Sequence, residues 1–105
     1  MAERTRLTPD QRRVDILTCA AEMAQTMGYR SVTRKDVAHR AGVATGLISY
    51  YFEDMIGFRD ALYRHALEHA ILPILAQGIT AGDPIAREIE PDLFTAAFET
   101  LRPSA

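Results

Sequence analysis

The chain has 105 residues, of which 48% are hydrophobic and 25% charged, so it is the size of one globular domain and its composition argues against wholesale disorder. No apolar run approaches the roughly 18 residues of a transmembrane helix, and the polar start MAERTR is unlike a secretory signal. The single cysteine, Cys19, can form neither an internal disulfide nor a zinc cluster. We therefore expect a cytoplasmic protein with no membrane contact and no cofactor.

Charge is distributed unevenly along the chain. Residues 1–52 carry eight basic and five acidic residues, a net charge of +3, whereas residues 53–105 carry four basic and nine acidic residues, a net charge of −5. Such an asymmetry is expected of a protein that meets a polyanion at one end. The total charge of −2 gives no such indication, and a solvated charge pattern without a partner explains the asymmetry equally well.

Caps and apolar spacing predict an all-α fold. Residues 1–7 are expected to form a flexible basic arm, and Thr8, Pro9 and Gln11 are typical of the start of a helix over residues 9–27. A second, two-turn helix is predicted between the cap Thr33 and Gly42, and a third over residues 44–52.

The second half of the chain is also predicted to be helical. Asp54 can cap a fourth helix that ends at Pro73, and residues 74–79 either prolong this helix past a kink or form a loop. Asp83 and Pro84 can start a short helix to residue 89, and Pro91 suits the start of a last helix.

Two short helices separated by a tight turn at Gly42 match the helix-turn-helix arrangement, in which the second helix enters the major groove of DNA. The small residues Ala44, Thr45 and Gly46 would let the front of that helix approach the bases. A plain helical hairpin with a glycine turn is the alternative.

Residues 28–52, GYRSVTRKDVAHRAGVATGLISYYF, resemble the N-terminal domain of the TetR family of transcriptional repressors, and the resemblance extends from about Arg13 to Leu62. It implies a three-helix DNA-binding domain over residues 8–54 with a helix-turn-helix, followed by a long fourth helix. It further implies a homodimer that represses transcription from a palindromic operator. The residues that it assigns to DNA, together with nearby basic residues, are Thr33, Arg34, Lys35, Ala44, Thr45, Gly46, Leu47, Ser49, Tyr50, Arg4 and Arg6.

The sequence departs from the family pattern at several of these positions. Ala44 replaces the usual Ser or Thr cap, Thr45 a basic residue, Ser49 a tyrosine, and Met55 a basic residue that contacts phosphate. These departures predict weaker non-specific affinity for DNA. Residues 55–105 are also too few to enclose a ligand pocket of roughly 300 Å³, so we expect no inducer-binding domain. A truncated chain is the alternative to a natural short form, which we favour because the tail has its own caps and apolar faces.

The last predicted helix carries an apolar stripe that we expect to form the dimer interface. Folding of this helix back onto the fourth helix is the alternative. The residues of the stripe are Leu93, Phe94, Ala97, Phe98 and Leu101.

Other candidate sites are weaker. His65 and His69 have the spacing of a metal-binding pair, but no third ligand stands at a convincing offset, so we expect two partly exposed helix residues and no metal. Tyr50 is expected to face outward and Phe52 inward. The sequence shows no nucleophile–base pair and no phosphate loop, which argues against an enzyme. The alternative function is a protein-interaction module or antirepressor that pairs with another TetR-like regulator.

Overall fold

The computed structural model describes residues 7–102, and over this range the chain is helical and has no strand. The elements are α1 (Pro9–Met27), α2 (Arg34–Ala41), α3 (Thr45–Phe52), α4 (Met55–Glu68), α5 (Leu72–Ala81), the 3₁₀ helix η2 (Pro84–Glu88) and α6 (Pro91–Glu99). The predicted all-α class is confirmed. None of these helices is long and apolar enough to cross a membrane.

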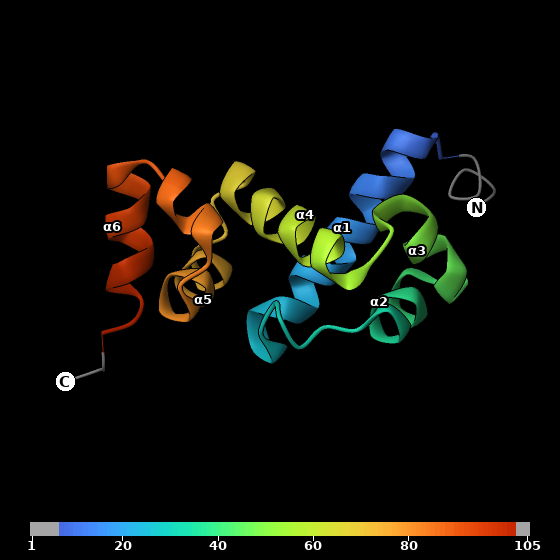
Figure 1. Ribbon diagram of the computed structural model, residues 1–105, viewed down its shortest axis with the longest axis horizontal. Helices are drawn as coiled ribbons and strands as arrows, with labels where there is room; N and C mark the ends of the chain where they lie inside the picture. The colour runs from blue at the N-terminus through green and yellow to red at the C-terminus, as the bar shows by residue number, and fades with distance from the viewer. Residues whose placement is uncertain (1–6, 103–105) are drawn as a thin grey trace.

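The molecule is elongated, measuring 47 × 27 × 24 Å. Helices α2 and α3 lie at one end, α6 lies at the other, and α1 and α4 cross between them (Figure 1). The core runs along this axis, from Val37 of α2 and Ile48 of α3, through Phe58 and Leu62 of α4, to Leu75 of α5.

Two capping boxes fix the starts of α1 and α2, as the sequence predicted. The Thr8 hydroxyl accepts a hydrogen bond from the backbone N–H of Gln11 at 3.1 Å, and the Gln11 side chain accepts one from the N–H of Thr8 at 3.0 Å. Thr33 and Asp36 repeat this exchange at α2, at 3.1 and 3.2 Å. Each box satisfies two N–H groups that the helix leaves without intrahelical partners.

The predicted end of the fourth helix at Pro73 is wrong. Helix α4 ends at Glu68, Ala70 adopts a left-handed φ of 53°, and the N–H of Ile71 closes the turn on the carbonyl of Ala66 at 2.9 Å. Pro73 lies in the first turn of α5, where its missing N–H costs nothing. Residues 74–79 are therefore neither an extension of α4 nor a loop, because they belong to a separate helix.

Helices α4 and α5 pack closely at Gly78. A Cβ atom at this position would overlap the aromatic ring of Tyr63, so only glycine admits the ring. The Tyr63 hydroxyl donates a 2.8 Å hydrogen bond to the carbonyl of Leu75, and burial raises the pKa of this phenol. The pair holds α5 in a fixed position against α4.

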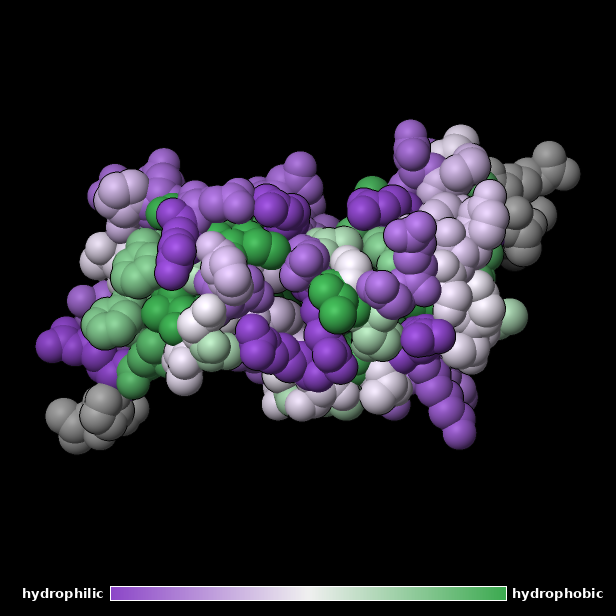
Figure 2. Space-filling view, in the orientation of Figure 1, coloured by the Kyte–Doolittle hydropathy of each residue, from purple (hydrophilic) through white to green (hydrophobic). Residues whose placement is uncertain are grey.

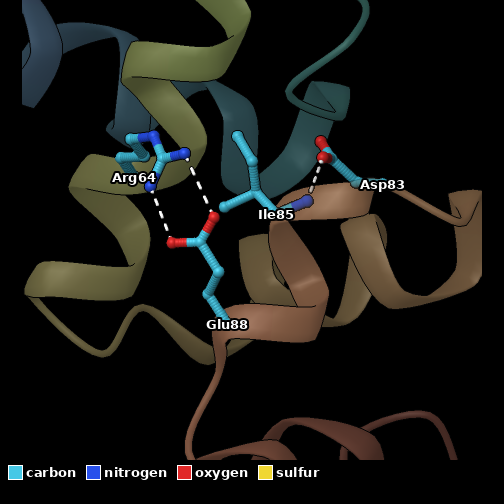
Figure 3. Close-up of polar contacts among 4 residues, drawn as sticks. All are labelled: Arg64, Asp83, Ile85 and Glu88. Carbon is cyan, nitrogen blue, oxygen red and sulfur yellow. Dashed lines mark hydrogen bonds and ion pairs between the residues drawn. The ribbon is translucent and has the colours of Figure 1, made fainter.

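Helix η2 is fixed at both ends. Asp83 caps it by accepting a 2.9 Å hydrogen bond from the N–H of Ile85, and Arg64 of α4 donates two hydrogen bonds to the carboxylate of Glu88, at 2.9 and 3.2 Å (Figure 3). The guanidinium of Arg64 lowers the pKa of Glu88. Because this ion pair is exposed, we expect it to orient η2 more than to stabilise it.

Candidate nucleic-acid interface

The turn between α2 and α3 depends on Gly42. Its φ of 71° lies in the left-handed region, which is strained for residues with a Cβ atom. The next N–H, of Val43, returns to the carbonyl of Ala38 at 3.0 Å and ends α2. The chain thereby reverses within three residues, and α3 packs against α2.

The front of α3 is small and exposed. Ala44 occupies the N-cap and makes no side-chain capping bond, as its residue type predicts. Thr45 and Gly46 follow, and both are exposed. A helix N-terminus with small side chains leaves room for a neighbouring molecule to approach its backbone N–H groups.

The two faces of α3 differ sharply. Ile48 and Phe52 are 1% and 6% exposed and hold the inner face against the core, whereas Tyr50 is 77% exposed. The prediction that Tyr50 faces outward and Phe52 inward is confirmed. The Tyr50 ring meets the ring of Tyr51 edge to face, with centroids 5.2 Å apart. This contact orients the exposed Tyr50 ring at the surface.

Polar groups on α2 border this outer face. Arg34 donates a 3.0 Å hydrogen bond to the Ser49 hydroxyl and so holds its guanidinium beside α3. Lys35 is exposed, and the Thr33 hydroxyl is occupied by the capping box with Asp36. The structure thus brings the predicted residues of α2 and α3 together, with Ser49 and Thr33 already engaged within the chain.

Several cations counted in the sequence are engaged elsewhere. Arg40 pairs with Glu22 at 2.9 Å, Arg30 donates to the Tyr29 hydroxyl at 3.2 Å, and Arg13 lies over the ring of Phe52 at 5.0 Å. Fewer guanidinium groups are therefore free to bind DNA than the residue count implies. The predicted contacts of Arg4 and Arg6 lie outside the described residues.

The predicted stripe on α6 divides into two faces. Ala97 is fully buried and Leu93 packs against the core, so these two residues hold α6 onto α5. Ala97 has no surface left for a partner, and its assignment to a dimer interface is wrong. Phe94, Phe98 and Leu101 remain 36%, 53% and 44% exposed, and the two rings stack with centroids 6.2 Å apart.

The expectation for the histidines of α4 is also corrected. His65 is buried rather than partly exposed, and only His69 lies at the surface. Glu68 comes close enough to both to act as a third ligand, because positions three and four apart share one helix face.

Sequence reasoning missed the contacts that join the N-terminal half of the chain to its C-terminal helices. The Gln77 amide accepts from the N–H of Tyr29 at 2.8 Å and donates to the carbonyl of Ala24 at 2.9 Å. The Tyr29 hydroxyl donates to the buried Asp83 at 2.6 Å. The capping role predicted for Asp83 is confirmed, but no local signal points to a partner 54 positions earlier.

Two short helices that meet at a glycine turn, with the second exposing a small and polar face, make this a helix-turn-helix protein. Residues 16–62 match a family described as "Bacterial regulatory proteins, tetR family". Residues 16–62 thus carry the DNA-binding domain of this family of regulators, as the sequence resemblance implied.

Curated relatives support this assignment. The chain is 33% identical over 58 residues to the HTH-type transcriptional regulator BetI of Serratia proteamaculans, a match that covers 55% of this chain and 29% of the relative. It is 30% identical to BetI of Pectobacterium carotovorum and 32% identical to BetI of Yersinia pestis, over 72% of this chain and 40% and 39% of the relatives. The chain thus spans less than half the length of the curated relatives that it matches. No solved structure matches it.

Proposed function

We propose that the chain is a DNA-binding transcriptional repressor that acts in the cytoplasm as a homodimer on a palindromic operator, and that it is not an enzyme. The observation that carries this proposal is the outer face of α3, where Thr45, Gly46 and Tyr50 are exposed while Ile48 and Phe52 anchor the opposite face. A helix held by one face and exposed on the other suits insertion into the major groove.

Each predicted residue except Thr33, whose hydroxyl caps α2, then has a role. The first turn of α3, from Ala44 to Leu47, approaches the base edges, and Tyr50 reaches a base or phosphate from the next turn. Arg34 and Lys35 border the groove on the α2 side and meet the phosphates, with Ser49 positioning Arg34 through their 3.0 Å hydrogen bond. Arg4 and Arg6 extend the phosphate contacts in this proposal.

The exposed residues of α6 form the proposed contact between copies. Phe94, Phe98 and Leu101 are exposed, and Figure 2 shows hydrophobic residues on the surface at the end of the molecule where α6 lies. A two-fold axis at this patch buries the same residues on both chains. Because α3 and α6 lie at opposite ends of a 47 Å molecule (Figure 1), the two long axes must diverge from α6 at an acute angle to bring two α3 helices about 34 Å apart.

Repression in this proposal comes from occupancy of the operator. The curated relatives carry the printed name of transcriptional regulators, which supports a role in transcription.

The test is selection of bound duplexes from a random pool, followed by titration of the selected duplex at several salt concentrations. We expect an inverted repeat with half-site centres about 10 base pairs apart and an affinity that falls with salt. Arg87→Ala, an exposed change on η2, is the control and should leave binding unchanged.

The same experiment addresses the alternative function. A chain that enriches no sequence and shifts no duplex, but forms a stable complex with a full-length TetR-like regulator, would be an antirepressor instead. Enrichment of single half-sites without symmetry would contradict the homodimer while retaining DNA binding.

A further inference from the structure

The last turn of α4 brings three metal-ligating side chains together. The nearest ligand atoms of His65, Glu68 and His69 all lie within 4.8 Å of one another. The two imidazole rings are 4.3 Å apart between centroids, and Nε2 of His69 lies 3.6 Å from Oε1 of Glu68. Such spacing permits a single ion to contact all three groups after small side-chain rotations.

The backbone beneath the cluster is well ordered by hydrogen bonds. The N–H of His69 donates to the carbonyl of His65 at 3.0 Å, and Ile71 closes the following turn on Ala66 at 2.9 Å. His65 is 8% exposed, so its ring is held by packing, whereas the other two ligands can adjust at the surface. The buried ring is therefore preorganised, whereas Glu68 and His69 must reorient when an ion binds.

The groove beside the cluster offers room for an ion and its water. It has a volume of about 360 Å³ between α1 and α4, with Val14 and Leu17 among its apolar lining. Arg13 and Arg64 also line it, but the guanidinium of Arg13 lies over Phe52 and that of Arg64 binds Glu88. Arg13 and Arg64 are therefore held by Phe52 and Glu88 and not by the metal-ligating atoms.

We propose that His65, Glu68 and His69 form a binding site for a divalent transition metal, of which Zn²⁺ is the best match. Two nitrogen ligands and one carboxylate oxygen are a donor set that zinc accepts, with water in the fourth position of a tetrahedron. Magnesium and calcium prefer oxygen ligands throughout, so these donors select against both. The bound ion links consecutive turns at the end of α4 and stabilises that end against fraying.

The test is a zinc titration of the untagged full chain in competition with a chromophoric chelator. Cys19→Ser serves as the background, so that no thiolate competes for the ion. We expect one zinc per chain, a higher melting temperature with zinc than without, and no comparable effect of magnesium. His69→Ala should lose the binding and the thermal shift, and Glu68→Gln should weaken both. Neither changes a buried residue, and far-UV circular dichroism checks their folding.

The matched control is His39→Ala. His39 is likewise an exposed histidine near the end of a helix, α2, and its removal should leave zinc binding unchanged. The proposal is overturned if the Cys19→Ser chain binds no zinc, if His69→Ala binds zinc as tightly as that background, or if His39→Ala abolishes binding. A stoichiometry of one zinc per two chains would equally overturn it, because the ion would then bridge copies. None of these outcomes bears on DNA binding.

Discussion

The phenolic hydroxyl of Tyr29 donates a 2.6 Å hydrogen bond to Oδ2 of Asp83, and this buried contact joins the helix-turn-helix half of the chain to its C-terminal helices. Tyr29 follows α1 and Asp83 caps η2, so neither lies inside a long helix. The second oxygen of Asp83 accepts from the N–H of Ile85, and the carboxylate is thereby held on both sides. The position of η2 thus depends on a residue of the N-terminal half.

Tyr29→Phe removes this bond while it keeps the ring. We expect the free energy of unfolding to fall by about 1–3 kcal/mol, because a buried carboxylate oxygen loses its donor. Urea denaturation measures the change. The control is Glu22→Gln, which removes the negative charge of the exposed partner of Arg40 and should cost at most about 1 kcal/mol. Equal small losses in both variants would mean that the Tyr29–Asp83 bond does not stabilise the fold.

Stability should also fall at high pH through the same residue. Burial, assisted by the hydrogen bond to Asp83, raises the pKa of Tyr29 to about 12. The fold favours the neutral phenol, so this contribution is fully present below the ordinary pKa of about 10 and is lost as the pH rises toward about 12. Unfolding measured in steps over this range should show the wild type losing its advantage over Tyr29→Phe. A constant difference between the two proteins would contradict the raised pKa.

Local sequence signals predicted most of the helices. They failed where contacts between residues distant in sequence determine the position or the end of a helix. Thr8 and Thr33 predict the starts of their helices because all residues of a capping box lie within four consecutive positions. The prediction at Pro73 is wrong because proline can either end a helix or start one, and the left-handed turn at Ala70 shows that here it starts one.

The sequence predicted which residues form the candidate site, but not which of them bind one another within the chain. The outward position of Tyr50 follows from helical spacing once Phe52 is placed inside. The hydrogen bond from Arg34 to Ser49 joins residues 15 positions apart and depends on the angle between α2 and α3. Sequence spacing alone does not determine that angle, and the burial of His65 and Ala97 likewise depends on the packing of whole helices.

Gly46→Ala should separate binding from stability. A Cβ atom at Gly46 meets nothing within 4 Å, so the substitution should stabilise α3 by up to about 1 kcal/mol. If α3 enters the groove closely, the added methyl group should nevertheless weaken operator binding. Urea unfolding and a DNA titration measure the two effects. Gly78→Ala is the contrasting change and should destabilise the fold strongly, because its Cβ overlaps Tyr63. Unchanged affinity for Gly46→Ala would place this position away from the DNA.

Thr45→Ala and Tyr50→Ala test the reading face directly. Both side chains are exposed, so stability should change by less than about 0.5 kcal/mol. Operator binding should weaken by about 1–3 kcal/mol for each residue that reaches a base or a well-placed phosphate. Titration of the selected duplex measures the loss. Full affinity in both variants would reject the insertion of α3 into the major groove.

The double variant Phe94→Asp, Phe98→Asp tests the α6 interface. The two rings stack on each other and remain 36% and 53% exposed, whereas Ala97 on the inner face is fully buried. Burying a phenylalanine contributes about 1.5–3 kcal/mol, and a charge in its place adds a desolvation cost, so the pair should split the dimer. The inner face of α6 is untouched, and circular dichroism should show the helices intact. Sedimentation of the wild type as a monomer at micromolar concentration, or of the double variant as an unchanged dimer, would exclude this interface.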